Sequence, residues 1–509
     1  MEKNIILIDG NNLTIEDFIA VSRYGRKVGI SPQAIKNMGE SHEMIQDIIK
    51  KKKPVYGVNT GFGKFSSVNI ELDQIELLQE NLIITHAVAV GAPLPEEAVR
   101  GMLLLRANAL AKGYSGIRPV VVETLILMLN KGVHPIVPEK GSLGASGDLA
   151  QLAHLVLVMI GRGEANYQGE RLPGKTAMEK AGIPLVKLEA KEGLALINGT
   201  QALTSIGVLA YYDAECLAKT ADIVAALSME ALEALPAAFD RKVQEVRPHP
   251  GQILVASNLR KLLEGSEIIA LATHERVQDS YSLRCTPQVH GATRDALAYV
   301  RKALVTEMNS VTDNPILFKE ENEVISGGNF HGQPLALALD FLGIAVAELA
   351  NISERRLERL VNPALSGGLP AFLAQNGGLN SGFMLCQYSA ASLVSENKVL
   401  AHPASVDSIP SSANQEDHVS MGTIAARKAK SIVENAQMVL AFELMCAVQG
   451  IDLRGGKPGK GTTCAYQVVR REIKFLSQDR ELRFDVEKAQ ELIRNESVLR
   501  EVFNLLDLQ

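Results

Sequence analysis

The chain has 509 residues, of which 46% are hydrophobic and 22% are charged, and its formal net charge at pH 7 is −6. This composition is typical of an ordinary soluble globular protein, and without a large basic cluster it argues against a nucleic-acid partner. The chain is longer than the size at which a single hydrophobic core keeps growing, so we expect two regions or one elongated bundle.

We expect neither a membrane-spanning segment nor a secretory signal. The apolar run 149–161 is too short to cross a bilayer, and charged residues flank it. The N-terminal run 1–9 lacks an adequate apolar region for a signal peptide. Five scattered cysteines show no C-x-x-C spacing, which favours a reduced, cytoplasmic compartment: Cys216, Cys285, Cys386, Cys446 and Cys464.

The first 86 residues predict a short strand at 5–8 and two helices. Ser31-Pro32 is a favourable start for the first helix, which Pro54 ends. Apolar residues at helical spacing over 72–82 predict the second, which runs up to Thr85-His86. A lone histidine at a helix end is more often a capping or core residue than a catalyst. We therefore leave the role of His86 open at this point.

A glycine-punctuated loop, 55–63, lies between these helices and has Tyr56 near its start. A loop tyrosine of this kind either packs on a helix or presents its phenol at a site. The residues alone favour neither interpretation of Tyr56.

The run Leu143-Gly144-Ala145-Ser146-Gly147-Asp148 combines three of the smallest side chains in a row. Such a run usually marks a tight turn before a helix, with Asp148 as the N-cap. A second reading is chemical. If the Gly147 nitrogen is pressed against the Ala145 carbonyl carbon, the three residues can close into a five-membered ring. Loss of the Ser146 hydroxyl as water then leaves a methylidene group on that ring, a strong carbon electrophile. A nucleophilic serine is a poorer alternative, because Asp148 stands where the G-x-S-x-G pattern needs its second glycine.

The run 169–176, GERLPGKT, satisfies the P-loop pattern G-x-x-x-x-G-K-[ST]. A P-loop follows a buried strand and precedes a sustained helix. The residues before this run are polar, and Gly182-Ile183-Pro184 follows almost at once. We therefore predict a surface hairpin that turns at Gly169.

From about residue 200 the chain predicts long helices, over 200–235, 334–361 and 422–449, with a shorter one around 486–503. Apolar residues from Leu335 to Leu349 alternate spacings of four and three, which is the pattern of a bundled helix. We expect a mostly α fold. Residues 1–199 would form a smaller N-terminal region carrying the Ala-Ser-Gly turn, and residues 200–509 a long-helix bundle.

Polar inserts rich in special residues separate these helices, at 277–284, 326–332 and 411–418. The cluster 415–418 invites a metal interpretation, but no ligand spacing such as H-E-x-x-H supports it. We expect no metal site, and helix ends that converge on a cleft in the bundle.

Taken together, these stretches resemble the aromatic amino acid ammonia-lyases over nearly the whole chain. The resemblance rests on the joint occurrence of several motifs in this order: 56–63, 144–149, Asn198-Gly199-Thr200, 278–284, 327–332 and 414–418. In that family the Ala-Ser-Gly triplet becomes 4-methylideneimidazol-5-one (MIO). The resemblance implies a helical bundle assembled as a homotetramer, with each active site built from several subunits.

The resemblance also implies roles for individual residues. Ala145, Ser146 and Gly147 would supply the MIO, and Tyr56 would be the general base, for which the site must favour the phenolate. Arg284 would grip the substrate carboxylate. Four residues would line and support the electrophile: Asn198, Gln278, Tyr281 and Phe330. His86 and Glu416 would face the substrate side chain.

Two positions bear on the substrate. Thr85-His86 matches the Ser-His pair of family members that act on histidine, whereas those for tyrosine and phenylalanine resemble His-Leu and Phe-Leu. An imidazole can donate to Glu416, which a phenyl ring would leave unpaired. We therefore expect conversion of L-histidine, as the small-molecule substrate, to trans-urocanate without metal, nucleotide or other external cofactor. The alternatives are a tyrosine or phenylalanine ammonia-lyase, an aromatic 2,3-aminomutase, and a helical scaffold in which the turn never cyclises.

Overall fold

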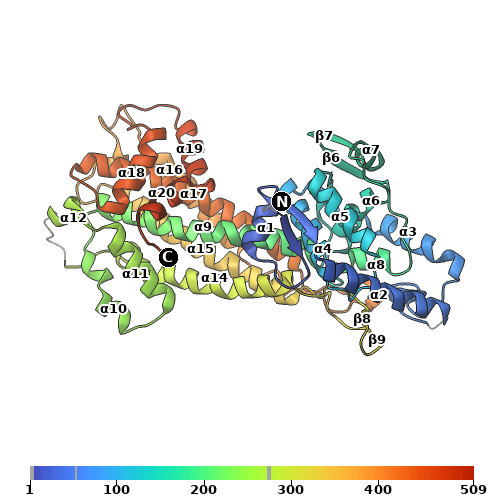
Figure 1. The fold of residues 1–509 in the computed structure, drawn as a ribbon. Coiled ribbons are helices and arrows are strands. Elements are labelled where there is room, and N and C mark those ends of the chain that lie inside the picture. Colours follow the sequence, from blue (N-terminus) through green and yellow to red (C-terminus); the bar gives the residue numbers. More distant parts are fainter. Residues whose placement is uncertain (1–4, 52–53, 272–276) are drawn as a thin grey trace. The chain divides into compact units, whose positions relative to one another are not determined.

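A computed structural model of the chain describes residues 5–51, 54–271 and 277–509 (Figure 1). These residues are mostly α-helical, with four small sheets of two or three strands, so the predicted mostly α fold is confirmed. They divide into two compact units. Unit 1 comprises Met1–Leu209, Arg301–Asp340 and Pro403–Arg427, and unit 2 comprises Ala210–Val300, Phe341–His402 and Lys428–Gln509.

The two units do not follow the expected split after residue 199. The division between them falls inside four long helices: α9 (Gln201–Ala231), α14 (Thr286–Met308), α15 (Gln333–Val361) and α17 (Gly422–Arg454). Because spatial contacts rather than chain order define the units, unit 1 also takes in the inserts around residues 326–332 and 411–418.

Unit 1 is built around α4, in which every residue from Ala98 to Ala111 is buried. Its neighbours include α1, α2, α5 and α6. A helix buried on all sides is a core element, so polar residues on α4 are enclosed by protein. Besides α4 (Glu96–Ala111) and its parts of the four long helices, unit 1 contains α1 (Ile15–Ser22), α2 (Pro32–Lys50), α3 (Ile75–His86), α5 (Pro119–Lys131), α6 (Leu149–Met159), α7 (Gly174–Lys180) and α8 (Glu192–Ile197).

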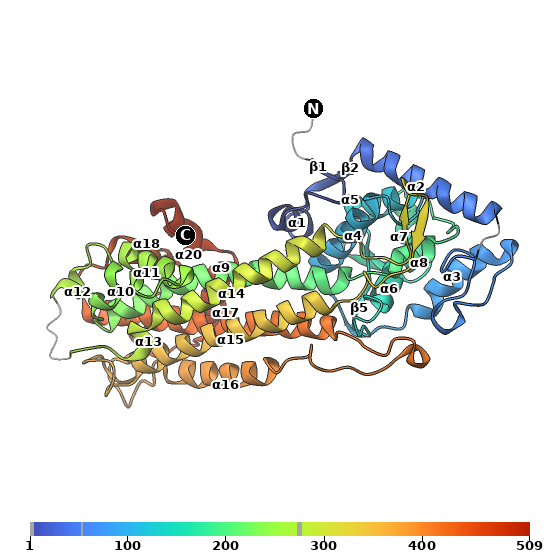
Figure 2. The same cartoon turned by 90° about the horizontal axis from the view of Figure 1, so that it is seen from below.

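Four small sheets complete unit 1. Strands β1 (Ile5–Ile8) and β2 (Lys27–Ile30) pair in parallel, with Ile5 opposite Lys27. The antiparallel pairs are β3 (Val90–Pro93) with β5 (Pro138–Lys140), β4 (His134–Pro135) with β6 (Glu164–Tyr167), β6 with β7 (Glu170–Pro173), and β8 (Ile316–Phe318) with β9 (Glu323–Ile325). Strand β8 lies beside α2 (Figure 2).

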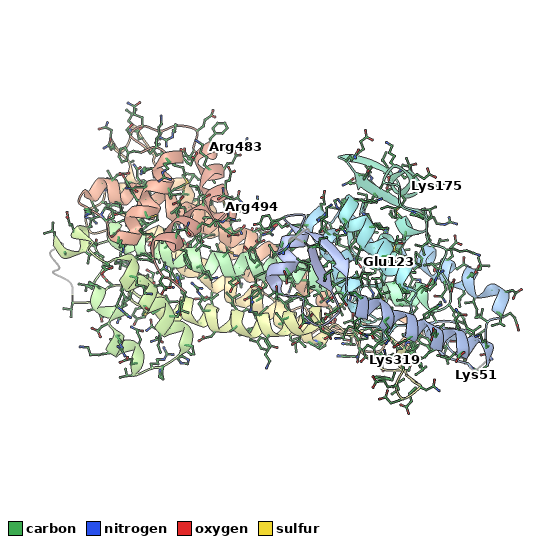
Figure 3. All side chains as sticks on the ribbon, viewed as in Figure 1. Lys51, Glu123, Lys175, Lys319, Arg483 and Arg494 are labelled. Atoms are coloured by element: carbon green, nitrogen blue, oxygen red, sulfur yellow. The ribbon has the colours of Figure 1, made fainter. Side chains whose placement is uncertain are left out.

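The P-loop-like run forms the predicted surface hairpin. Strands β6 and β7 turn at Gly169, whose φ of +82° lies in the left-handed region that glycine favours. Lys175, the lysine of the pattern, points outward from the short helix α7 (Figure 3), where its side chain is 65% exposed. The hairpin interpretation is therefore confirmed.

Unit 2 consists of helices and short turns. Besides its parts of the four long helices it contains α10 (Arg241–Glu245), α11 (Pro250–Leu262), α12 (Glu267–Leu271), α13 (Tyr281–Arg284), α16 (Met384–Leu400), α18 (Lys460–Glu472), α19 (Arg483–Arg494) and α20 (Ser497–Leu505). The single helix predicted around 486–503 is wrong. Two helices replace it, because Glu496 between them adopts a left-handed φ of +60° that stops the first.

The expectation that no apolar stretch reaches spanning length is also wrong as it stands. Helices α15 and α17 each contain an 18-residue window long and apolar enough to cross a membrane. Those windows are 67% and 78% buried within the protein, however, which is the behaviour of core helices. The seam from Leu335 to Leu349 is part of this buried surface.

Candidate active site

The Ala145-Ser146-Gly147 turn lies between β5 and α6, pressed against the Asn198–Gly199 backbone. Gly147 has φ of +71°, and a Cβ added there would lie 2.1 Å from the carbonyl oxygen of Gly199. No side chain fits in that space, so position 147 requires glycine. The Asp148 N–H donates to the same oxygen at 2.7 Å. The turn is therefore held closely against the Gly199 backbone.

Asn198 holds the turn through a second contact. Its Nδ2 donates to the carbonyl oxygen of Ser146 at 3.0 Å. This is the oxygen that the expected ring would retain as its own carbonyl. The tight backbone at Gly147 and this donor are the two features that a ring formed from these three residues needs, so the residues present fit the MIO group.

Asp148 does not cap α6 with its side chain, as the simple turn interpretation proposes. Its fully buried carboxylate accepts instead from the Leu203 N–H and the Ser142 hydroxyl, each at 2.8 Å, and from the Thr423 hydroxyl. Burial raises the pKa of Asp148, and these hydrogen bonds oppose that rise. Asp148 thus ties the base of the turn to the first turn of α9 and to the start of α17.

Glu416 accepts a hydrogen bond from the one polar side chain of the Ala145–Gly147 turn. The Ser146 hydroxyl donates to Glu416 Oε1 at 2.8 Å, and the Ser411 hydroxyl donates to Oε2 at 2.8 Å. Between Ser411 and Glu416 the chain makes a turn in which Ser412, Ala413 and Asn414 all have positive φ. Left-handed backbone costs roughly 1–2 kcal/mol for each residue other than glycine. The segment that delivers Glu416 is therefore strained.

A cavity of about 730 Å³ opens beside Ser146 and is large enough for an amino acid. Its lining comes entirely from unit 1. The polar side chains are Tyr56, Lys64, Asn81, Thr85, His86, Ser146, Asn198, Ser412 and Glu416, and the apolar ones include Phe62, Phe65, Leu78, Leu82, Leu149 and Leu194. A smaller cavity of about 210 Å³, which is also lined by Ala145 and Gly147, shares Thr85, His86, Ser146 and Glu416 with it.

Tyr56 lines this cavity with its hydroxyl oxygen accepting from the Gly63 N–H at 3.4 Å. Burial raises the pKa of Tyr56, the Gly63 contact lowers it, and the charges of Glu416 and Asp313 raise it further. The phenol is consequently protonated at neutral pH. The requirement that the site favour the phenolate is not met by the groups of unit 1.

His86 ends α3 with its Nδ1 3.2 Å from the Thr85 hydroxyl. Burial lowers the pKa of His86, although the negative charge of Glu416 opposes this. The ring is therefore neutral at pH 7, and it faces the cavity from the same side as Thr85. His86 is a cavity residue rather than a core residue.

The structure brings most of the expected site residues together but not all of them. Tyr56, His86, Ser146, Asn198 and Glu416 share the larger cavity. Phe330 is half-buried and lines neither of these cavities. Its neighbour His331 stacks instead on His418, with ring centroids 5.7 Å apart.

Gln278, Tyr281 and Arg284 belong to unit 2, on and before the short helix α13. Tyr281 is 71% exposed, and the guanidinium of Arg284 lies over its ring at 4.7 Å from the centroid. Gln278 is also exposed. Arg284 is half-buried, and its Nε is buried without a hydrogen-bond partner among the described residues.

Two contributors were missed by sequence reasoning. Ser411 binds the second oxygen of Glu416, and Lys64 supplies the one cationic side chain among the described residues that line the larger cavity. Lys64 directly follows the glycine loop 55–63, which is a signal that was available. Ser411 had no comparable signal, because its role depends on the strained turn. Within the described residues, no group of three or more histidine, cysteine or acidic side chains is placed to hold a metal ion.

Comparison with known proteins adds independent findings. Residues 13–471 match the family model described as aromatic amino acid lyase. A histidine ammonia-lyase of Alkaliphilus metalliredigens is 59% identical over 504 residues, covering 99% of each chain. The crystal structure of histidine ammonia-lyase from Trypanosoma cruzi superposes with a TM-score of 0.92 at 43% identity, covering 99% of this chain and 96% of the other. Tyrosine aminomutase from Streptomyces globisporus gives 0.94 at 37% identity, with 99% of both chains covered.

Proposed function

The chain belongs to the aromatic amino acid lyase family, and from that premise we propose that it eliminates ammonia from L-histidine to give trans-urocanate. The observation that carries the choice of substrate is the position of Glu416. Its carboxylate faces the cavity beside Ser146, on the side where His86 also points. The family membership removes the earlier alternative of a helical scaffold without activity.

The electrophile of the proposed reaction is the MIO ring formed from Ala145, Ser146 and Gly147. When formed, it supplies a methylidene carbon that takes up the substrate amine and turns it into a better leaving group. The compressed backbone at Gly147 and the Asn198 donor support this assignment. Asn198 Nδ2, which donates to the Ser146 carbonyl oxygen, would stabilise negative charge on that oxygen.

The substrate side chain would occupy the end of the cavity that Glu416 and His86 share. The carboxylate of Glu416 accepts a hydrogen bond, and a histidine imidazole can donate one. A phenyl ring cannot, and once the Ser146 hydroxyl has left as water it would leave Oε1 of Glu416 without a donor, at a cost of about 1–3 kcal/mol. Because neutral His86 has one donor and one acceptor nitrogen, it can complete the recognition of a second imidazole.

Tyr56 would remove the β-proton of the substrate onto its hydroxyl oxygen. Since burial and the charge of Glu416 raise its pKa, a positive charge must approach to make the phenolate accessible. Arg284 is our candidate for that charge and for the grip on the substrate carboxylate. We assign Gln278, Tyr281 and Arg284 to the active site of a neighbouring copy of the chain in a homotetramer. We also assign Phe330 a role in supporting the electrophile.

No external cofactor is proposed. The electrophile is internal, so activity should survive exhaustive chelation and need neither nucleotide nor pyridoxal phosphate. We place the enzyme in the cytoplasm, in a histidine-degrading role. Light scattering that shows an active monomer would contradict the tetramer, and strict dependence on an added metal would contradict the internal electrophile.

The test is to offer L-histidine, L-tyrosine and L-phenylalanine separately to the purified protein and to follow the conjugated acids by absorbance. We expect urocanate from histidine far ahead of the other products. Coumarate or cinnamate as the dominant product would mean that Thr85, His86 and Glu416 were misinterpreted. A β-amino acid product would indicate an aminomutase, the activity of the structurally similar Streptomyces globisporus protein.

A further inference from the structure

Arg106 lies in the middle of α4, directly beneath the backbone that presses on the turn. Its side chain is 1% exposed, and all its hydrogen bonds come from one nitrogen, Nη1. That nitrogen donates to the carbonyl oxygens of Asn198 at 3.2 Å and Thr312 at 3.0 Å, and to Gln201 Oε1 at 2.9 Å. The guanidinium therefore joins the segment before α9 to the segment after α14.

The contact between Arg106 and this segment is close enough to fix its position. A Cβ added to Gly199 would lie 2.1 Å from Arg106 Nη1 on one side, just as a Cβ added to Gly147 would lie 2.1 Å from Gly199 O. The guanidinium, the Gly199 backbone and the Gly147 backbone are thus stacked in order with no room for a side chain. A displacement of Asn198–Gly199 toward α4 would relax the turn.

The chemistry of Arg106 does not suit a purely structural role. Its Nε and Nη2 are buried without a hydrogen-bond partner among the described residues. Burying a cation with incomplete partners is unfavourable, and well-packed apolar residues often replace such groups with no loss of stability. Burial lowers the pKa of Arg106 to about 10, so the group is still charged at neutral pH. A retained, costly charge at this position points to a task beyond packing.

We propose that Arg106 is a positioning residue for ring closure, acting through the Asn198–Gly199 backbone that it holds against Gly147. This inference rests on the proposed function, because it concerns the ring that Ala145, Ser146 and Gly147 form. Arg106 does not touch the reacting atoms. It fixes the Asn198–Gly199 backbone, which packs against Gly147. It thereby also positions Asn198, whose side chain binds the Ser146 carbonyl oxygen.

Ring closure needs no outside reactant. A bond forms from the Gly147 nitrogen to the Ala145 carbonyl carbon, and the Ala145 oxygen leaves as water with the protons of the Gly147 and Ser146 nitrogens. The Ser146 Oγ leaves as a second water with the Ser146 Cα proton. The peptide that carries the turn therefore becomes lighter by two waters, which reports ring formation without any assay of activity.

The experiment follows that mass change in newly made protein. Cells are given a pulse of isotope-labelled amino acids, samples are quenched at intervals, and the internal peptide is weighed. The variants are R106K, which keeps the charge, and R106M, which keeps the bulk. Arg100 is the matched control, because it is a buried arginine on the same helix whose nitrogens bond carbonyls of Val21, Ser22 and Leu129, away from the turn.

We expect R106K and R106M to form the ring about tenfold more slowly or less completely than wild type, the loss expected when hydrogen bonds from a charged group are removed. R100K should match the wild type. Circular dichroism should show that R106M is folded. If R106M does not fold, the rate of ring formation in R106K tests the proposal. Wild-type rates in a folded R106M or in R106K would overturn the inference, as would an equal loss in R100K. A wild-type peptide that never loses two waters would instead contradict the proposed function.

Discussion

Two clusters of buried charge, one in each unit, differ in the groups that they bind. In unit 2, Arg356 and Glu443 are both fully buried, and Glu443 accepts from Arg356 through each of its oxygens, at 2.5 and 3.0 Å. The hydroxyls of Ser228 and Ser353 complete the carboxylate. This cluster joins α9, α15 and α17 through side chains alone. Its charges are paired with one another.

Around the Ala145–Gly147 turn of unit 1, two buried charges bind backbone groups as well as side chains, although Lys191 and Asp313 elsewhere in unit 1 form a fully buried ion pair at 2.7 Å. Arg106 donates to the carbonyl oxygens of Asn198 and Thr312, and Asp148 accepts from the N–H of Leu203. The Asn198–Gly199 segment contacts the Ala145–Gly147 turn, and Asp148 directly follows the turn. The difference shows that a buried charge can hold helices together or can hold a reactive turn in shape. Substitutions in unit 2 should therefore change stability, and substitutions around the turn should change chemistry.

The largest effect is expected from Ser146→Ala, which breaks the chemistry of unit 1 alone. The variant lacks the hydroxyl that must leave, so the internal peptide should keep its full mass. Activity on histidine should fall by at least about a thousandfold, because the variant cannot form the electrophile that the chemical step needs. Denaturant unfolding should match wild type. Substantial activity in this variant would contradict the mechanism.

Glu443→Leu is the corresponding test of unit 2. It leaves the buried Arg356 without its partner, which should lower the free energy of unfolding by about 3–5 kcal/mol. The double variant with Arg356→Met should recover most of that loss, because no charge is then left buried. Urea unfolding measures both variants. Turnover per folded molecule should be unchanged, and a large drop in it would mean that unit 2 charges also shape the site.

Glu416→Gln tests the carboxylate that faces the cavity. The amide cannot accept through both of its terminal atoms, so histidine turnover should fall by about ten- to a hundredfold while folding persists. Glu434→Gln, a carboxylate-to-amide change at an exposed position of unit 2, is the control and should behave as wild type. A tyrosine or phenylalanine activity that rises above that on histidine would also support the substrate assignment.

The same variant has a second, pH-dependent consequence. Tyr56 acts as a base only when deprotonated, and its raised pKa makes the active fraction grow as pH rises. After burial, the negative charge of Glu416 is one cause of that raised pKa. Removing the charge should lower the pKa of Tyr56, so the ascending limb of the kcat/KM profile should move to lower pH. A limb that stays in place would show that another group titrates there.

The smallest effect is expected from Ala413→Gly in the strained segment that delivers Glu416. Glycine relieves the positive φ of +52°, but it also gains more freedom in the unfolded chain. The two effects oppose each other, so the free energy of unfolding, measured by thermal denaturation, should change by no more than about 1 kcal/mol. The same change at Ala109, inside α4, should be clearly destabilising. Equal losses in the free energy of unfolding at positions 413 and 109 would contradict the inference that the 412–414 backbone is strained.

The parts of the fold that were predicted correctly depend on neighbouring residues. Ser31 accepts from the Ala34 N–H as a cap should, and β6 and β7 turn at Gly169. In each case the residue that predicts the helix start or the turn lies within a few residues of it. The same local rule was wrong at Asp148, because Leu203 and Thr423 from distant segments, together with nearby Ser142, donate to its side chain in place of the helix N-terminus.

The cavity residues were predictable only through the family resemblance. Nothing local in the sequence connects Ser146 with Glu416, which lies 270 positions away. Arg106 lies 92 positions from Asn198 and gave no signal, since an arginine on an apolar helix resembles any buried polar residue. Distant pairings of this kind arise from packing, which periodicity and turn chemistry do not encode.

The most direct test of the account is the mass of the internal peptide that carries residues 145–147, taken from the same preparation that is shown to convert L-histidine. The account predicts that this peptide is lighter by two waters and that the fraction so modified follows the specific activity from one preparation to the next. An unmodified peptide recovered from fully active enzyme would contradict it.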